Sequence, residues 1–63
     1  MPLIHVEMLE GRSEEIKEQL IAELTDTTVS VLGVNRESVR VVLVDVPKSH
    51  WGIGGVTAKE LGR

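Results

Sequence analysis

The stretch from Ser38 to Val46 limits the possible folds of this chain more than any other part of it. It reads Ser-Val-Arg-Val-Val-Leu-Val-Asp-Val, so it is rich in β-branched residues and apolar on both faces rather than on alternate positions. A strand with two apolar faces is usually covered on both sides. The sequence therefore predicts a strand over 38–46 that other elements cover, and Pro47 is expected to end it.

Residues 3–9 predict a first strand. Successive side chains in a strand point to opposite faces, and here apolar character recurs at every second position. The residues expected to face one way are Ile4, Val6 and Met8, and those expected to face the other way are Leu3, His5 and Glu7.

A long helix is predicted between the two strands, over about 13–32. Ser13 has the side chain of an N-cap, and Glu14 and Glu15 place negative charge at the positive end of the helix. Apolar residues and threonines recur every three or four positions and form one stripe. Its members are Ile16, Leu20, Ile21, Leu24, Thr27, Thr28, Val31 and Leu32. Gly33 fits the position just past the helix end.

The order strand, helix, strand predicts an α/β fold, a β-α-β unit with parallel strands and a right-handed crossover. One helix covers one face of a two-stranded sheet, so the other face needs another copy of the chain. A chain of 63 residues has a thin core, and without cysteine it forms no disulfide. His5 and His50 lack a recognisable ligand spacing and are expected on the surface or in packing. We therefore expect a single domain over 1–63 that assembles as an oligomer.

The C-terminal segment is rich in glycine. Residues 49–55 read Ser-His-Trp-Gly-Ile-Gly-Gly, with three glycines around Trp51, the only aromatic residue of the chain. This pattern predicts a turn or a short hairpin. Residues 56–63 fit either a short helix or an edge strand.

Composition argues against several classes of partner. The formal net charge is −3, with 7 basic and 10 acidic residues, whereas a nucleic-acid-binding surface normally clusters Lys and Arg. No apolar run approaches the roughly 20 residues that a membrane-spanning helix needs. The first residues lack the basic and apolar regions of a signal peptide. A cytoplasmic protein without nucleic-acid or membrane partners is therefore expected.

Pro2 stands directly behind Met1, and a residue this small at position two ordinarily allows the methionine to be removed. The free proline is then a secondary amine. An ordinary α-amino group has a pKa of about 7.7–8.0, and desolvation or neighbouring cations lower that pKa further. A rigid base that titrates near the working pH suits general acid–base catalysis. The alternative is that Pro2 merely begins a strand, where proline is tolerated.

Four short segments occur in order along the chain. They are Met-Pro-Leu-Ile at 1–4, Leu-Glu-Gly-Arg-Ser at 9–13, Ser-Val-Arg-Val at 38–41 and Trp-Gly-Ile-Gly-Gly at 51–55. Together they resemble the short-chain 4-oxalocrotonate tautomerase family of the tautomerase superfamily, over essentially the whole chain. The resemblance implies a β-α-β protomer, usually a homohexamer built from dimers. It also implies a cofactor-independent isomerase of the kind used in aromatic degradation.

The resemblance also implies the site residues. Pro2, unmasked by loss of Met1, would move a proton from a dienol hydroxyl to a distant carbon. Arg12 would bind the remote carboxylate of the substrate, and Arg40 of a neighbouring subunit would contact the 2-hydroxyl or ketone oxygen and its adjacent carboxylate. Trp51 occupies the position where the family usually has a phenylalanine, and its ring would form one wall of the pocket. Guanidinium groups bind carboxylates through paired hydrogen bonds, and in a water-poor pocket they would stabilise a developing enolate.

Each of these residues also has a purely structural interpretation. Arg12 fits a solvated loop, and Trp51 fits a residue that fills the core. Arg40 interrupts an apolar strand, where a charge needs a partner, and a salt bridge to Glu10 or Asp45 would supply one.

The expected substrate is a small unsaturated keto or enol acid such as 2-hydroxymuconate. Relatives that hydrate or dehalogenate such acids need a carboxylate where this chain has Ile53. Glu7, Glu10 and Asp45 do not match that motif, so a hydratase-type reaction is expected only as a weak side activity. The alternatives to an enzyme are an oligomeric domain that only binds small carboxylates, or a hexamer that keeps the fold without the site.

Overall fold

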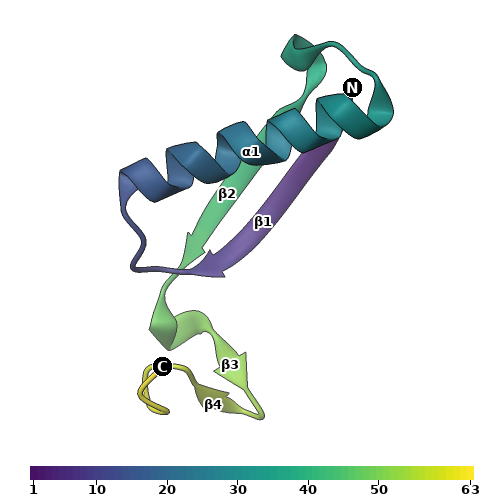
Figure 1. The fold of residues 1–63 in the computed structure, drawn as a ribbon. Helices are drawn as coiled ribbons and strands as arrows, with labels where there is room; N and C mark the ends of the chain where they lie inside the picture. The colour runs from purple at the N-terminus through teal and green to yellow at the C-terminus, as the bar shows by residue number, and fades with distance from the viewer.

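The computed structural model describes residues 1–63 and contains a β-α-β unit followed by a small hairpin (Figure 1). Strand β1 spans Leu3–Leu9, helix α1 spans Glu14–Leu32 and strand β2 spans Arg40–Val46. A short 3-10 turn, η1, spans Arg36–Ser38 and leads into β2.

Strands β1 and β2 pair in parallel, with Leu3 beside Arg40 and Leu9 beside Val46. The predicted parallel β-α-β unit is therefore confirmed. The predicted start of the second strand at Ser38 is wrong by two residues. Ser38 lies in η1, where its hydroxyl donates to the carbonyl oxygen of Asn35 at 2.7 Å. Such local bonds of serine favour turns over a strand ladder.

Both predicted ends of helix α1 are confirmed. At its start, the Ser13 hydroxyl oxygen accepts a hydrogen bond of 3.2 Å from the backbone N–H of Ile16. At its end, Gly33 has φ +68° and its N–H donates to the carbonyl oxygen of Val29 at 2.9 Å. The positive φ is the reason that glycine suits this position.

Helix α1 covers one face of the sheet. Its Lys17 reaches Asp45 of β2 at 2.6 Å, so Asp45 points toward the helix. Strand alternation then places Val41 and Leu43 on the same face, and the register places Ile4, Val6 and Met8 beside them. The opposite face has no cover within the chain, and Leu3 and Val42 are 65% and 42% exposed there.

The apolar stripe of α1 is shorter than predicted. Leu20, Leu24 and Thr28 are half-buried, whereas Ile16 and Val31 are 54% and 75% exposed. The helix is about 28 Å long and the strands are about 23 Å long, so the ends of the helix extend past the sheet. Within one chain the stripe is therefore half-buried at Leu20, Leu24 and Thr28, whereas its other members, including Ile21 near its centre, are exposed.

Residues 47–63 form a C-terminal arm. It begins with the 3-10 turn η2 over Lys48–His50 and continues with an antiparallel hairpin of β3, Gly52–Ile53, and β4, Val56–Thr57. Gly54 and Gly55 have φ +58° and +85°, and a type I′ turn requires positive φ at both central residues. The predicted hairpin is confirmed. Residues 56–63 begin as a short strand and end in turns, so the helix alternative is wrong.

The arm extends beyond the end of β2, away from the two layers of the β-α-β unit (Figure 1). The radius of gyration is 14.7 Å, against about 11 Å for a compact chain of this length. Only Val39 and Ala58 are buried. A single chain therefore leaves most of its apolar side chains at least partly exposed. Helix α1 does not have the hydrophobicity that a membrane-spanning helix requires.

Candidate active site

Pro2 and Arg40 lie at the same edge of the sheet. Pro2 is half-buried just before β1, and its carbonyl oxygen accepts a hydrogen bond of 3.0 Å from the backbone N–H of Arg40. Parallel strands begin at one edge, which is why two residues 38 positions apart become neighbours. Met1 is 85% exposed, so the bond that joins it to Pro2 lies at the surface.

The side chain of Arg40 has no carboxylate partner. It is exposed, and its Nη1 donates to the backbone carbonyl oxygens of Glu37 and, at 3.4 Å, Val39. The alternative of a salt bridge to Glu10 or Asp45 is wrong, because neither carboxylate contacts this guanidinium. The remaining N–H groups of the guanidinium are therefore available to an anion.

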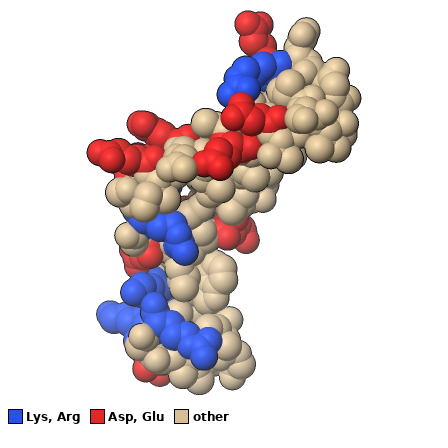
Figure 2. Space-filling view, in the orientation of Figure 1, with Lys and Arg blue, Asp and Glu red and all other residues tan.

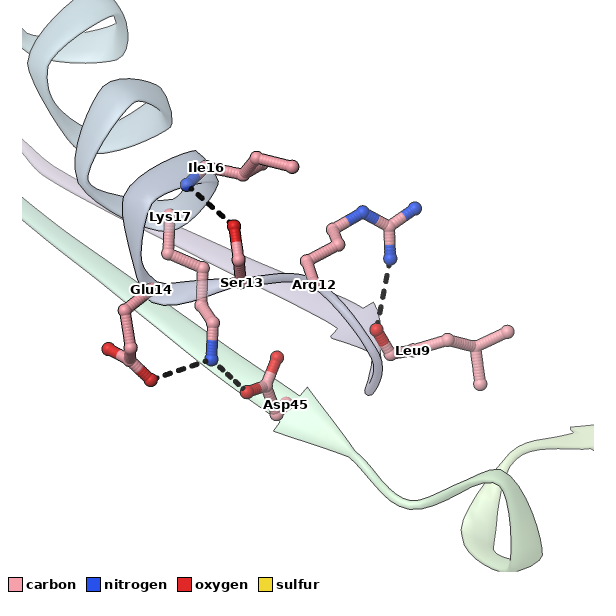
Figure 3. A network of polar contacts seen from close by, with 7 residues as sticks. All are labelled: Leu9, Arg12, Ser13, Glu14, Ile16, Lys17 and Asp45. Carbon is pink, nitrogen blue, oxygen red and sulfur yellow. Dashed lines mark hydrogen bonds and ion pairs between the residues drawn. The ribbon is translucent and has the colours of Figure 1, made fainter.

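Asp45 is instead paired with the helix. Its Oδ2 lies 2.6 Å from Nζ of Lys17, and Oε1 of Glu14 lies 3.4 Å from the same nitrogen (Figure 3). The hydrogen bond to Asp45 is the main cause that raises the pKa of Lys17 above its ordinary value. This ion pair fastens the first turn of α1 to the end of β2, so Asp45 has a structural role.

Arg12 lies in the loop between β1 and α1. Its guanidinium is turned back along this loop, and Nη1 donates to the carbonyl oxygen of Leu9 at 3.0 Å (Figure 3). The side chain is exposed and has no carboxylate partner. Its solvated loop position agrees with the structural interpretation, and its unpaired charge also suits an anion-binding group.

Trp51 lies in the arm, between η2 and β3. Its side chain is half-buried, and its carbonyl oxygen accepts a hydrogen bond of 2.8 Å from the backbone N–H of Ala58. Ala58 is fully buried, whereas Trp51 is not, so the tryptophan does not fill a core within the single chain.

One chain does not bring the four predicted site residues together. Pro2 lies just before β1 and Arg40 is the first residue of β2, whereas Arg12 and Trp51 follow the opposite ends of those strands. A seven-residue strand is about 23 Å long, which separates the two pairs by roughly that distance. We refer to these pairs as the proline end and the arm end of the chain.

Positive charge gathers around the arm end. The arm contains Lys48, Lys59 and Arg63, with Glu60 as its one acidic residue. Figure 2 shows Lys and Arg side chains grouped over the arm, whereas Asp and Glu side chains are grouped over the helix. A local excess of positive charge raises the local concentration of anions, so this end suits a substrate carboxylate.

The other acidic and imidazole groups are dispersed. His5 Nε2 lies 3.7 Å from Oε1 of Glu7, and both side chains are more than half exposed on the uncovered face of the sheet. No group of three or more His, Asp or Glu side chains is placed to hold a metal ion.

Glu10 is a residue whose contact the sequence did not indicate. Its Oε2 accepts a hydrogen bond of 2.9 Å from the backbone N–H of Lys48, which lies 38 positions further along the chain. The partner is a backbone group, so no complementary side chain in the sequence marks this contact.

Comparisons with known proteins agree with this architecture. A family described as "Tautomerase enzyme" matches residues 2–60. The 2-hydroxymuconate tautomerase of Comamonas testosteroni is 52% identical over 63 residues, which cover 100% of both chains. A 4-oxalocrotonate tautomerase isozyme structure from Methylibium petroleiphilum has a TM-score of 0.91 and 47% identity, and the match covers 98% of this chain and 100% of that one. A heterohexamer 4-oxalocrotonate tautomerase from Chloroflexus aurantiacus has a TM-score of 0.89 and 38% identity, with 97% and 98% covered. The chain therefore belongs to the tautomerase family, a family of isomerases.

Proposed function

We propose that this protein is a cofactor-independent enol–keto tautomerase of small unsaturated 2-hydroxy acids such as 2-hydroxymuconate. Pro2 is the acid/base once Met1 has been removed. The observation that carries the proposal is the Arg40 guanidinium, which lies at the sheet edge where β1 and β2 begin and which no carboxylate neutralises, so it is available to the Pro2 site of a neighbouring subunit. The similarity to 2-hydroxymuconate tautomerases supports the substrate class, and such a reaction fits the degradation of aromatic compounds.

The proposed reaction moves one proton. The free amine of Pro2 takes the proton from the 2-hydroxyl group of the dienol, and the oxygen lone pair forms the ketone. The double bonds shift along the carbon chain of the substrate, and its distal carbon takes the proton from the Pro2 ammonium. Atoms and electrons balance without any further reactant, and the same group serves as base and then as acid.

The two arginines bind the two ends of the substrate in this proposal. Arg40 of a neighbouring subunit contacts the 2-oxygen and its adjacent carboxylate, where negative charge develops in the enolate. Fixed cationic donors at that point stabilise the transition state more than the ground state. Arg12 binds the remote carboxylate, and Trp51 limits the access of water to the pocket.

This site requires self-association, which we propose to be a homohexamer. The proline end and the arm end of one chain lie at opposite ends of the strands, so they meet only across subunits. The uncovered sheet face, with Leu3 65% and Val42 42% exposed, and the extended arm support such an assembly. The Chloroflexus aurantiacus relative is described as a heterohexamer.

The test is ketonisation of 2-hydroxymuconate by the wild type and by Pro2→Ala, with intact-mass measurement of both samples. Alanine at position two also allows removal of Met1 but leaves a flexible primary amine in place of the rigid secondary amine, so kcat is expected to fall by about 10²-fold. A wild-type sample that keeps Met1 is expected to be inactive, because its Pro2 nitrogen is an amide. Undiminished activity of Pro2→Ala contradicts the mechanism. Carboxylate binding without turnover, in protein that has lost Met1, identifies the non-catalytic binding domain instead.

A further inference from the structure

One hydrogen bond joins the C-terminal arm to the β-α-β unit. Among the hydrogen bonds and salt bridges of the chain, only the bond from the Lys48 backbone N–H to Oε2 of Glu10, 2.9 Å long, joins residues 47–63 to residues 1–46. Apart from the covalent connection at Val46–Pro47, the direction in which the arm leaves the sheet has no other polar restraint.

Backbone hydrogen bonds hold the residues at both ends of this contact. Its backbone N–H donates to the carbonyl oxygen of Val46 at 3.0 Å, which continues the ladder between β1 and β2 by one residue. On the arm, the carbonyl oxygen of Lys48 accepts a bond of 3.2 Å from the backbone N–H of Lys59. The Glu10 carboxylate thus connects a fixed point on the sheet to a point within the folded arm.

This contact joins the two segments that form the arm end. Glu10 precedes Arg12 by two residues, and Lys48 precedes Trp51 by three. We propose that Glu10 is a positioning residue, whose carboxylate sets the direction of the arm and thereby places Trp51 relative to Arg12. The expected effect of Glu10 on turnover rests on the proposed function, whereas its expected effect on the direction of the arm does not.

A carboxylate is well suited to this role. Hydrogen bonds in which the acceptor is ionised are stronger than those between neutral groups, so they compete better with water at an exposed position. Glu10 is exposed, so replacing it is not expected to disturb packing. Glutamine at this position keeps a side-chain oxygen that accepts a hydrogen bond, whereas alanine does not.

Trp51 reports on the arm directly, because it is the only aromatic residue of the chain. In Glu10→Ala we expect its fluorescence to move to longer wavelength and to be quenched more readily by acrylamide, since a less restrained arm exposes the ring to water. Glu10→Gln is expected to lie between the wild type and Glu10→Ala, because its neutral oxygen still accepts the bond but more weakly. Glu18→Ala, which removes an exposed helix carboxylate that makes no hydrogen bond or salt bridge, is the matched control.

The kinetic readout is the KM for 2-hydroxymuconate. Loss of a hydrogen bond to a charged group is expected to raise KM by about tenfold in Glu10→Ala, with kcat close to the wild-type value. The pH dependence of kcat is expected to stay unchanged, because the Glu10 carboxylate is bonded to the Lys48 backbone N–H and takes no part in the proposed proton transfer. A kcat loss with unchanged KM contradicts a role in positioning the arm end.

The donor side of the bond provides an independent test. Lys48→Pro removes the backbone N–H, and the ψ of +142° at Pro47 is compatible with a following proline. Lys48→Ala removes only the side chain and is its control. If the bond is the cause, Lys48→Pro reproduces the fluorescence changes of Glu10→Ala and Lys48→Ala does not. The double variant Glu10→Ala with Lys48→Pro then shows no larger fluorescence change than either single variant.

Two further results overturn the proposal. One is unchanged Trp51 fluorescence in both Glu10→Ala and Lys48→Pro. The other is a Glu10→Gln variant as impaired as Glu10→Ala, which shows that the charge and not the hydrogen bond matters. Failure of the proposed function gives a different pattern, in which Pro2→Ala keeps its activity while the fluorescence differences at Glu10 persist.

Discussion

The backbone N–H of Arg40 lies 3.0 Å from the carbonyl oxygen of Pro2 and donates a hydrogen bond to it. This bond fixes the start of β2 beside the proposed acid/base without using the Arg40 side chain. The guanidinium bonds only to backbone carbonyl oxygens, at Glu37 and Val39. Side-chain substitution at Arg40 therefore tests its role in binding and catalysis with little effect on the strand pairing.

We predict that Arg40→Ala lowers kcat/KM for 2-hydroxymuconate by about 10²- to 10³-fold, the usual cost of removing one donor that stabilises an oxyanion. Arg40→Lys is expected to recover part of the loss, because lysine keeps the charge but not the paired donors. The free energy of unfolding should change by no more than about 0.5 kcal/mol, since the side chain is exposed. Steady-state kinetics and urea unfolding measure the two quantities, and equal activity of Arg40→Ala and wild type contradicts the assignment.

A second prediction concerns Arg12 and the second carboxylate of the substrate. Arg12→Ala is expected to raise the KM for a dicarboxylate by about tenfold, which corresponds to the loss of one charge-assisted hydrogen bond. An analogue that lacks the remote carboxylate should be converted equally well by the variant and the wild type. Equal losses with both substrates would assign Arg12 to the loop bond with Leu9 rather than to recognition.

Local signals predicted most of the fold. These signals depend on contacts within a few residues, and the structure contains each of them. They are the helix cap at Ser13, the left-handed conformation of Gly33 and the hairpin turn at glycines 54–55. The predicted start of β2 is two residues too early, because the Ser38 hydroxyl donates a hydrogen bond to the carbonyl oxygen of Asn35. This bond stabilises a turn, and strand propensity does not predict it.

Long-range contacts were less accessible from the sequence. Periodicity predicts the apolar stripe of α1, but it does not predict which members of the stripe the sheet of one chain covers, and these are Leu20, Leu24 and Thr28. The alternative that Arg40 pairs with Glu10 or Asp45 is wrong, because Asp45 pairs with Lys17 of the helix and Glu10 bonds to the Lys48 backbone. The four site residues came from motif resemblance, and their separation within one chain follows only from the strand pairing.

A third prediction tests the uncovered face of the sheet. Val42 lies on this face and is 42% exposed, so a second copy that covers it would bury an apolar side chain. Val42→Asp is expected to reduce the mass measured by light scattering, because a carboxylate buried at an interface costs several kcal/mol. Ser30→Asp, on the exposed surface of α1, is the control and should leave the mass unchanged. A wild-type monomer, or an unchanged mass for Val42→Asp, contradicts assembly through this face.

The last prediction follows from the hydrogen bond to Asp45, which raises the pKa of Lys17 above its ordinary value. A lysine whose pKa is higher in the folded state stabilises that state below the unfolded pKa, which is about 10.4. This stabilisation is lost as the pH rises through the folded pKa. We therefore expect wild type to be more stable than Lys17→Met by a constant amount between pH 7 and 9. The difference in the free energy of unfolding is expected to shrink once the pH exceeds the unfolded pKa.

Urea unfolding followed by Trp51 fluorescence, at one protein concentration throughout, measures this difference in stability. Lys59→Met, which removes a lysine outside any salt bridge, is the control. A difference that does not diminish as the pH rises above the unfolded value, or one that is absent at pH 7, shows that the ion pair between α1 and β2 does not stabilise the folded chain.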